Sequence, residues 1–135
     1  MDVDQDKLEA LAGFRSALRR FLAFSEEATS LAGVTPQQYQ ALLAVGAAGS
    51  LNVGVFAREL LLKQNAAVQL IDRLAAQGLV ERVPDADDRR SVQIALTPKG
   101  RALLIRLAGL HLDQLARRKK QFADILRRLK RTQAE

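Results

Sequence analysis

Apolar residues recur at helical spacing along most of the chain, and this pattern predicts a mainly helical protein. The first helix is expected over residues 6–31, where leucines and phenylalanines form a broad apolar stripe. The stripe consists of Leu8, Leu11, Phe14, Leu18, Phe21, Leu22 and Phe24. A second helix is expected from Thr35-Pro36, because threonine caps helices, proline favours the first helical position and Gln38 can close a capping box.

The middle of the chain combines helical and strand-like patterns. A short extended piece at residues 51–53 precedes a third helix over residues 53–62. The expected apolar face of this helix consists of Val55, Phe56, Leu60 and Leu61. The next helix starts near Gln64 and ends at Gly78, because glycine tolerates the positive φ of a helix C-terminus. Two β-favouring runs follow at residues 79–83 and 92–96, and a charged loop separates them. These runs predict a β-hairpin.

Two more helices are expected after the hairpin. Thr97-Pro98 repeats the earlier start signal and begins a long helix that runs to about Arg118. An amphipathic helix follows over residues 121–131, although one bent helix is the alternative because the break rests on charge density alone. A compact monomer could pack the first and last helices together. A two-fold dimer, in which they interleave with their mates, is the favoured arrangement.

The order of the central elements is that of a winged helix-turn-helix: a helix, a tight turn, a second helix and a hairpin. Other small α+β domains could share this order and remain the alternative. We predict a mainly α protein with a small β-hairpin (α+β class), in which a winged helix-turn-helix core carries N- and C-terminal dimerisation helices. The expected parts are an N-terminal dimerisation helix (1–34), a DNA-binding domain (35–100) and C-terminal dimerisation helices (101–135).

Composition narrows the chemistry. The chain has 135 residues and no cysteine, which excludes disulfides and thiol catalysis, and a single histidine, His111, argues against an enzyme or a metal site. No cofactor is expected. The acidic N-terminus lacks the apolar core of a secretory signal, and no apolar run is long enough to span a membrane. We therefore expect a cytoplasmic protein without a membrane partner.

The formal net charge of +6 favours a polyanionic partner, but the charge is unevenly placed. Residues 52–101 hold eight basic and six acidic side chains, whereas residues 111–135 hold eight basic and three acidic ones. The excess therefore lies mostly in the C-terminal segment, where a solvated helix face is an ordinary explanation. Charge alone does not identify the DNA-reading part.

The helix that starts near Gln64 carries the candidate base-reading residues. Gln64, Asn65 and Gln69 have amides that can pair with an adenine edge, while the small Ala66 and Ala67 would allow close approach and contact thymine methyls. The candidates for phosphate contact are Lys63 and Arg73 together with the amides at the helix start. The alternative is a helix with ordinary exposed polar residues.

The hairpin loop, residues 85–90, holds three acids and two arginines. It lacks the alternating ligands, glycine and distal glutamate of a calcium loop. As a wing, it could place Arg89 and Arg90 in a minor groove, with Asp88 bracing Arg90; a solvated hairpin loop is the alternative. Asp72 would repel phosphate if it faced DNA, so we expect it to hold a basic side chain elsewhere in the domain.

One ordered set of residues resembles the MarR family of bacterial transcription regulators. It consists of Asp72-Arg73-Leu74, Gly78-Leu79-Val80-Glu81-Arg82, Asp88-Arg89-Arg90-Ser91-Val92 and Leu96-Thr97-Pro98-Lys99-Gly100. The resemblance extends to the helix order on both sides. It implies a dimer built from the N- and C-terminal helices and a recognition helix that starts near Gln64. It also implies a wing arginine at Arg90 that Asp88 braces, with Arg89 beside it. Many members resemble repressors that leave a palindromic operator when a small, often phenolic or aromatic, anion binds.

The resemblance leaves the effector open. Peroxide-sensing branches use cysteine and zinc-sensing branches use several histidines, so neither is a model for this chain. The effector-binding residues are unknown; Phe14, Leu18, Tyr39 and Leu43 could line a pocket, but core packing is the preferred interpretation. The predicted partners are double-stranded DNA, a second copy of the chain and a small-molecule effector. The alternative function is a winged-helix module that binds DNA or protein without an effector.

Overall fold

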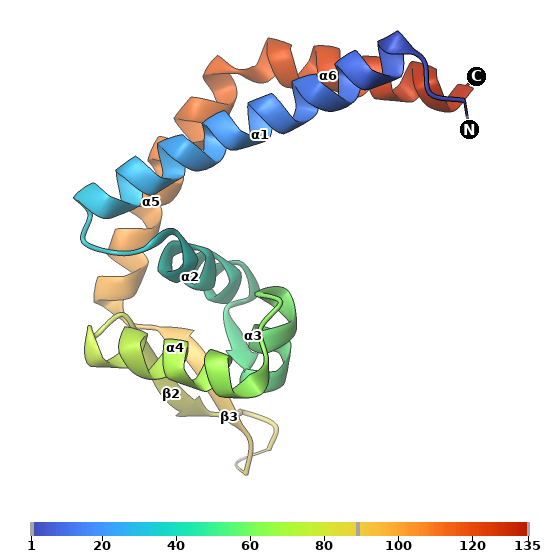
Figure 1. Ribbon diagram of the computed structural model, residues 1–135. Coiled ribbons are helices and arrows are strands. Elements are labelled where there is room, and N and C mark those ends of the chain that lie inside the picture. The colour runs from blue at the N-terminus through green and yellow to red at the C-terminus, as the bar shows by residue number, and fades with distance from the viewer. Residues whose placement is uncertain (1, 89, 135) are drawn as a thin grey trace. The chain divides into compact units, whose positions relative to one another are not determined.

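The computed structural model describes residues 2–88 and 90–134, without the side chains of the last three (Figure 1). Within this range the chain forms six helices and three strands. Their order is α1 (Gln5–Leu31), α2 (Pro36–Ala48), β1 (Ser50–Asn52), α3 (Val53–Glu59), α4 (Gln64–Ala76), β2 (Val80–Pro84), β3 (Val92–Leu96), α5 (Pro98–Arg117) and α6 (Lys119–Ala134). The predicted fold class, mainly α with a winged helix-turn-helix core, is confirmed.

The chain divides into two compact units. The central unit contains Thr29–Gly109, and the helical unit contains Met1–Ala28 together with Leu110–Glu135. Helix α5 begins in the central unit and ends in the helical unit. Across the described residues, no helix combines the length and apolar character needed to cross a membrane.

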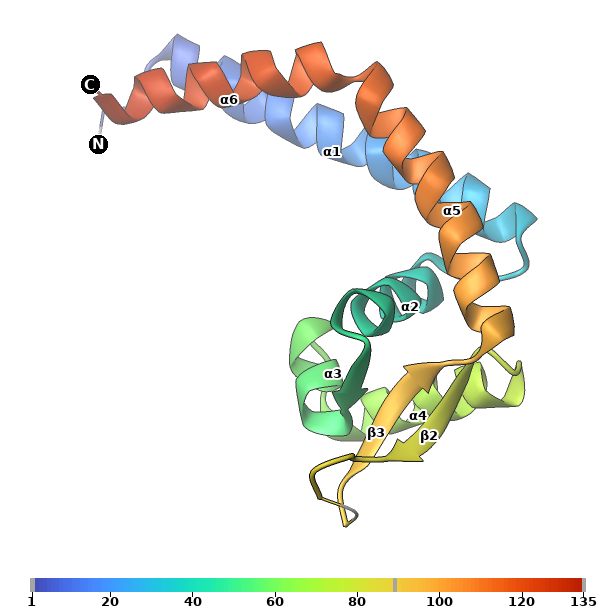
Figure 2. The same ribbon diagram turned by 180° about the vertical axis from the view of Figure 1, so that it is seen from behind.

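A small antiparallel sheet, helices α2, α3 and α4, and the first part of α5 form the central unit. The strand order is β1-β3-β2, and Ile94 of β3 pairs with Leu51 on one side and Arg82 on the other. The core includes Leu42, Phe56, Ile71, Leu74 and Ile94, all with 0% exposure, because the apolar faces of α2, α3 and α4 turn toward the sheet. Figure 2 shows α4 behind the sheet, with the β2–β3 loop projecting beyond the helices.

Local signals determine where several of these helices begin. Thr35 and Gln38 form the predicted capping box, with both of its hydrogen bonds at 3.0 Å. Asn52 caps α3 by accepting from the Val55 amide at 2.8 Å. The sequence pattern placed this residue in an extended piece and did not predict its capping role. Gly46 lies where α2 packs against α5, and a Cβ there would come within 2.4 Å of the Leu104 side chain.

The end of α3 differs from the prediction. The helix stops at Glu59, and Leu61 follows in the left-handed region with φ 55° and 93% exposure. Leu61 was expected on the buried face of this helix, and that expectation is wrong. The tight turn into α4 requires a residue with positive φ, and this geometry turns the side chain away from the core.

In the helical unit, α6 runs antiparallel beside α1 (Figures 1 and 2). Arg128 of α6 reaches Glu9 at 3.2 Å and Asp6 at 3.7 Å on α1. His111 of α5 is buried and lies 2.8 Å from the Ser25 hydroxyl, with Phe21 and Phe24 packed edge-on against its ring.

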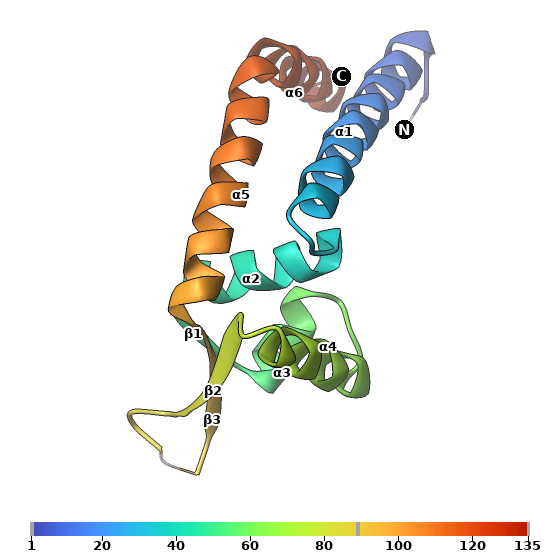
Figure 3. The ribbon, with the colours of Figure 1, turned by 90° about the vertical axis from the view of Figure 1, so that its left-hand side faces the viewer.

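The C-terminal helices are two rather than one. Arg118 separates α5 from α6, and its amide donates back to the Leu115 carbonyl at 3.1 Å in a tightened last turn of α5. The break predicted near residues 118–121 is therefore present. Figure 3 shows the change of direction between the two helices.

Candidate nucleic-acid interface

Helix α4 has one buried face and one exposed face. Ala67, Leu70, Ile71 and Leu74 are buried at helical spacing and anchor the helix to the core of the central unit. The opposite face is exposed and carries the six DNA-contact candidates predicted on and next to this helix. These are Lys63, Gln64, Asn65, Ala66, Gln69 and Arg73. Ala67 is an exception to the prediction: with 0% exposure it belongs to the core and cannot contact a thymine methyl.

The N-terminus of α4 lacks a side-chain cap. Lys63 occupies the N-cap position with extended backbone angles, and its side chain makes no capping hydrogen bond. The N-cap residues of α2 and α3, Thr35 and Asn52, both accept from a first-turn amide. An uncapped helix start leaves amide donors and the positive end of the helix dipole available to an anion such as a phosphate group.

Asp72 also lies on the exposed face of α4, and its charge is matched within the protein. The Asp72 carboxylate accepts from the Arg82 guanidinium of β2 at 2.5 Å, which confirms that it holds a basic side chain elsewhere in the domain. The side chains are 60% and 42% exposed, so the pair contributes only about 0–1 kcal/mol to folding. Its local effect is to tie α4 to β2 and to offset a negative charge near the candidate interface.

The C-terminal end of α4 is held by residues from two other elements. Gly78 ends the helix with φ 72°, as predicted, and its carbonyl accepts from the Thr97 hydroxyl at 2.5 Å. The Lys99 ammonium donates to the Gln77 carbonyl at 2.9 Å, and the Gln38 amide reaches the Gln77 side chain at 3.3 Å. Gln77 is thus contacted from both α2 and α5.

Gly100 brings the start of α5 against the start of the hairpin. A Cβ on this glycine would lie 1.9 Å from the Leu79 carbonyl oxygen, so only glycine fits. The Thr97 hydroxyl accepts from the Gly100 amide at 3.0 Å, while the Thr97 amide donates to the Leu79 carbonyl at 3.1 Å. These contacts explain the threonine and the glycine that follow the end of β3.

Hydrogen bonds from main-chain amides to aspartate side chains shape the wing loop. The Asp85 carboxylate accepts from the Asp87 amide at 3.1 Å, and the Asp88 carboxylate accepts from the Arg90 amide at 3.0 Å. Aspartate favours such turns because its short side chain reaches an amide two residues ahead. Asp88 therefore contacts the backbone of Arg90, whose side chain is exposed. Arg89, the other arginine predicted to contact DNA, lies outside the described residues.

The acidic loop is not part of a metal cluster in the described part of the chain, where no group of three or more possible ligands occurs. His111 is a packed residue in the helical unit.

The four residues considered as possible effector contacts behave differently from one another. Tyr39 is buried in the central unit, and this burial raises the pKa of its phenol. Phe14, Leu18 and Leu43 are 39–43% exposed, so the preference for core packing holds for Tyr39 alone. Phe14 and Leu18 belong to the helical unit and Leu43 to the central unit.

The sequence did not predict the contacts between the C-terminal end of α4 and distant parts of the chain. Gln38 was recognised as part of a capping box and Lys99 as part of a motif, yet both contact Gln77. The only sequence signal was the position of Lys99 in the motif that ends with Gly100.

The exposed face of α4 and the adjacent hairpin define a winged helix-turn-helix protein. A model of the MarR family matches residues 32–91. YsmB, an uncharacterized HTH-type transcriptional regulator of Bacillus subtilis, is 32% identical over 101 residues, which cover 72% of this chain and 69% of that protein. The chain belongs to the MarR family.

Two further comparisons agree with this assignment. The multiple antibiotic resistance protein MarR of Salmonella typhimurium is 31% identical over 70 residues, and these cover 52% of this chain but only 49% of that protein. A mutant MarR from Escherichia coli, solved in complex with operator DNA, has the same fold with a TM-score of 0.69 at 21% identity. The structural match covers 98% of this chain and 99% of that one.

Proposed function

We propose that this protein is a sequence-specific DNA-binding transcription regulator that inserts α4 into a major groove. The observation that carries this proposal is the exposed polar face of α4, which starts at an uncapped N-terminus and lies opposite a fully buried face. Its relative YsmB is named as a transcriptional regulator, and the matched MarR structure was solved with operator DNA.

The polar residues on the exposed face of α4, together with Ala66 and the N-cap residue Lys63, have proposed roles. Gln64, Asn65 and Gln69 read base edges, since amides pair bidentately with adenine, while the methyl of Ala66 contacts thymine. Lys63 and Arg73 bind phosphate groups and determine the register of the helix on the duplex. Asp72 is tied to Arg82, so its charge opposes DNA less than a free carboxylate would.

The wing is proposed to contact the minor groove next to the site of α4. Arg90, which is exposed at the end of the hairpin loop, supplies a weakly hydrated guanidinium that suits a narrow groove. Asp88 supports this contact through the Arg90 amide rather than through an ion pair with its side chain, because its carboxylate accepts from that amide. Arg89 is proposed as a second wing contact.

A homodimer is proposed from the helical unit. Large apolar side chains remain exposed there on α1, α5 and α6, and so many exposed leucines in one unit suggest a surface that a partner covers. They include Leu8, Leu11, Leu18, Leu22, Leu112, Leu115 and Leu126, which are 38–66% exposed. A two-fold dimer would cover these side chains and present two copies of α4 to the half-sites of a palindromic operator.

Selection of bound sequences from a random DNA pool tests the core of the proposal. The expected result is a palindrome whose half-sites are about one helical turn, or roughly 10 base pairs, apart. Affinity for the selected DNA should fall steeply with salt, because phosphate contacts release counterions. A pool without enrichment, or binding that does not respond to salt, would contradict the assignment.

We further propose that the regulator is a repressor released from DNA by a small ligand, in line with the many family members that respond to phenolic or aromatic anions. The competing function is a winged-helix module without an effector. A panel of phenolates added to the preformed protein–operator complex separates the two. Release by at least one compound supports the ligand-responsive repressor, whereas retention with every compound favours the module without an effector.

A further inference from the structure

The junction between α5 and α6 carries the densest positive charge of the chain. Four consecutive basic residues, Arg117–Lys120, cross the break between the helices. The last two occupy the first turn of α6, which contains no acidic residue. Cations at a helix N-terminus are unfavourable, because the dipole and the free amides there are themselves positive. An anion at this end of α6 would remove that repulsion.

A solvent-open pocket with a volume of about 730 Å³ lies at this junction. The described residues that line it are all polar: Gln114, Arg117, Arg118, Lys120, Gln121 and Asp124. This elbow pocket lies entirely within the helical unit. Since its described lining offers no apolar side chain, it suits a hydrophilic anion rather than the aromatic ring of a phenolate.

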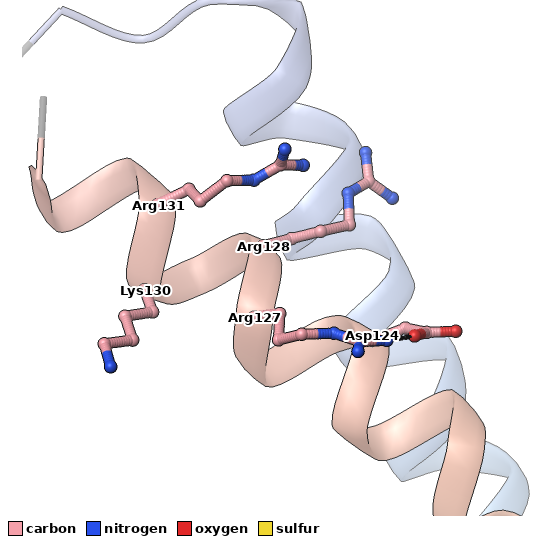
Figure 4. A pocket seen from close by; sticks show the side chains of 5 residues that line it. All are labelled: Asp124, Arg127, Arg128, Lys130 and Arg131. Carbon is pink, nitrogen blue, oxygen red and sulfur yellow. Dashed lines mark hydrogen bonds and ion pairs between the residues drawn. The ribbon is translucent and has the colours of Figure 1, made fainter.

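The carboxylates near the elbow pocket are already engaged. Asp124 forms an ion pair with Arg127, which extends toward it along α6 (Figure 4). Asp113 pairs with Arg117 at 3.2 Å. Among the described residues, Arg118 and Lys120 have no carboxylate within 4.0 Å, which leaves two cations of the pocket unmatched.

The guanidinium of Arg118 has a buried donor that is not satisfied within the described structure. Its Nη1 donates to the Gln121 side chain at 3.4 Å, but its Nε is buried and has no hydrogen-bond partner in the described structure. Buried donors without partners are rare in proteins, and those that occur often belong to sites for ions or ligands. A guanidinium also presents its donors in a planar fork that matches phosphate oxygens.

We propose that the elbow pocket binds a small phosphate-bearing anion. Arg118 and Lys120 bind the phosphate oxygens directly, Arg117 adds to the positive field, and the first-turn amides of α6 complete the site. The inference does not depend on the DNA-binding role of the central unit.

The second cationic pocket, on the C-terminal half of α6, has different properties. It is lined by Asp124, Arg127, Arg128, Lys130 and Arg131. Figure 4 shows Lys130 pointing away from the pair formed by Asp124 and Arg127. Arg128 is held by Glu9 and Asp6 of α1. Because Arg127 and Arg128 are already paired and Lys130 points away, this region supplies matched controls rather than a second site.

The test is a calorimetric titration of the full-length protein with inorganic pyrophosphate at constant ionic strength. A titration with chloride at the same ionic strength is the reference. The expected result is saturable binding by the wild type. Arg118→Gln and Lys120→Gln should each weaken it at least about tenfold, which corresponds to the loss of one charge-assisted hydrogen bond. Arg131→Gln and Lys130→Gln remove the same types of charge from exposed positions of α6 outside the elbow pocket, and they should leave the affinity within about twofold of the wild type.

Three results would overturn the proposal. The first is no saturable binding of pyrophosphate to the wild type. The second is an equal loss for all four variants, which would show general attraction to a basic surface. The third is a pair of observations on Arg118→Gln and Lys120→Gln: both variants bind pyrophosphate as tightly as the wild type, and both lose affinity for a non-operator DNA duplex. The junction would then contact nucleic acid. Lys120 is exposed, so Lys120→Gln keeps the test interpretable if Arg118→Gln disturbs folding.

Discussion

Leu61 combines two unfavourable features at the turn between α3 and α4. It adopts a φ of 55°, a region that costs a non-glycine residue about 1–2 kcal/mol, and it exposes 93% of its surface. The strain is tolerated because the buried apolar faces of the two helices determine the path of the turn. It is a local cost of joining them over a short distance.

Leu61→Gly is therefore expected to stabilise the protein by about 0.5–1 kcal/mol, because relief of the left-handed strain exceeds the added entropy of the unfolded chain. Urea denaturation measures the change. Leu61→Ala is the control, since alanine keeps the strain and removes an exposed side chain with few contacts. Equal stabilities of the glycine and alanine variants would contradict the interpretation.

Substitution of Arg90 tests the proposed contact between the wing and DNA. Arg90→Ala should weaken operator binding by about 1–3 kcal/mol, because it removes a minor-groove guanidinium but keeps the amide that Asp88 accepts from. Quantitative gel retardation gives the affinity, and circular dichroism checks the fold. Arg106→Ala removes the same charge from an exposed position on α5 and should have little effect. Equal affinities of wild type and Arg90→Ala would remove the wing from the mechanism.

At the scale of elements, the ends of α4 are built differently. The C-terminal end is held by Gln38, Thr97 and Lys99 from α2 and the start of α5, whereas the N-terminal end at Lys63 has no side-chain cap. The held end determines the direction of the helix, and the open end offers its amides to an anion. This asymmetry is what a helix needs if it is to present its first turns to DNA.

Lys63→Ser tests this asymmetry. A serine cap should stabilise the fold by about 0.5–1 kcal/mol, because it satisfies a first-turn amide, while DNA affinity falls through loss of a charge and of a free donor. Thermal unfolding and gel retardation measure the two effects. Lys63→Ala separates them, since it removes the charge without adding a cap. A serine variant that gains no stability over the alanine variant would show that the α4 start is already satisfied in another way.

At the scale of the molecule, the helical unit leaves an apolar surface that a single chain does not cover. Leu126 on α6 is 64% exposed although its neighbour Ile125 is buried. The amphipathic pattern that predicted the helix thus has one side packed on α1 and another directed outward. A second copy is the partner that we propose for the outward side.

Leu126→Glu should convert the dimer into monomers or insoluble protein, because it places a charge in the proposed subunit contact. Light scattering coupled to size-exclusion chromatography gives the mass. Arg131→Glu introduces a glutamate at an exposed position of α6 that lies on a different side of the helix from Leu126, and it should leave the dimer intact. A soluble Leu126→Glu dimer would place the interface elsewhere.

The periodic patterns were sufficient for the element order and for the exposed face of α4. Thr35, Gly78 and Thr97 gave correct boundaries because capping and positive φ depend on residues that are close in sequence. The prediction was wrong for Ala67, which is buried, and for Leu61, which is exposed. Helical spacing gives the direction of a side chain, but it does not give the width of the buried face, which includes Ala67. It also does not give the point where a helix stops, and α3 stops before Leu61.

The sequence by itself therefore determined a winged helix-turn-helix, the helix that presents amides outward and the hairpin that carries Arg90. The tertiary structure alone decided that Asp72 pairs with Arg82, that Gln38 and Lys99 meet at Gln77, and that Gly100 must lie against Leu79. The reason is physical. Periodicity and capping arise within a few residues, whereas these contacts join segments separated by 10 to 39 positions and exist only once the core has packed.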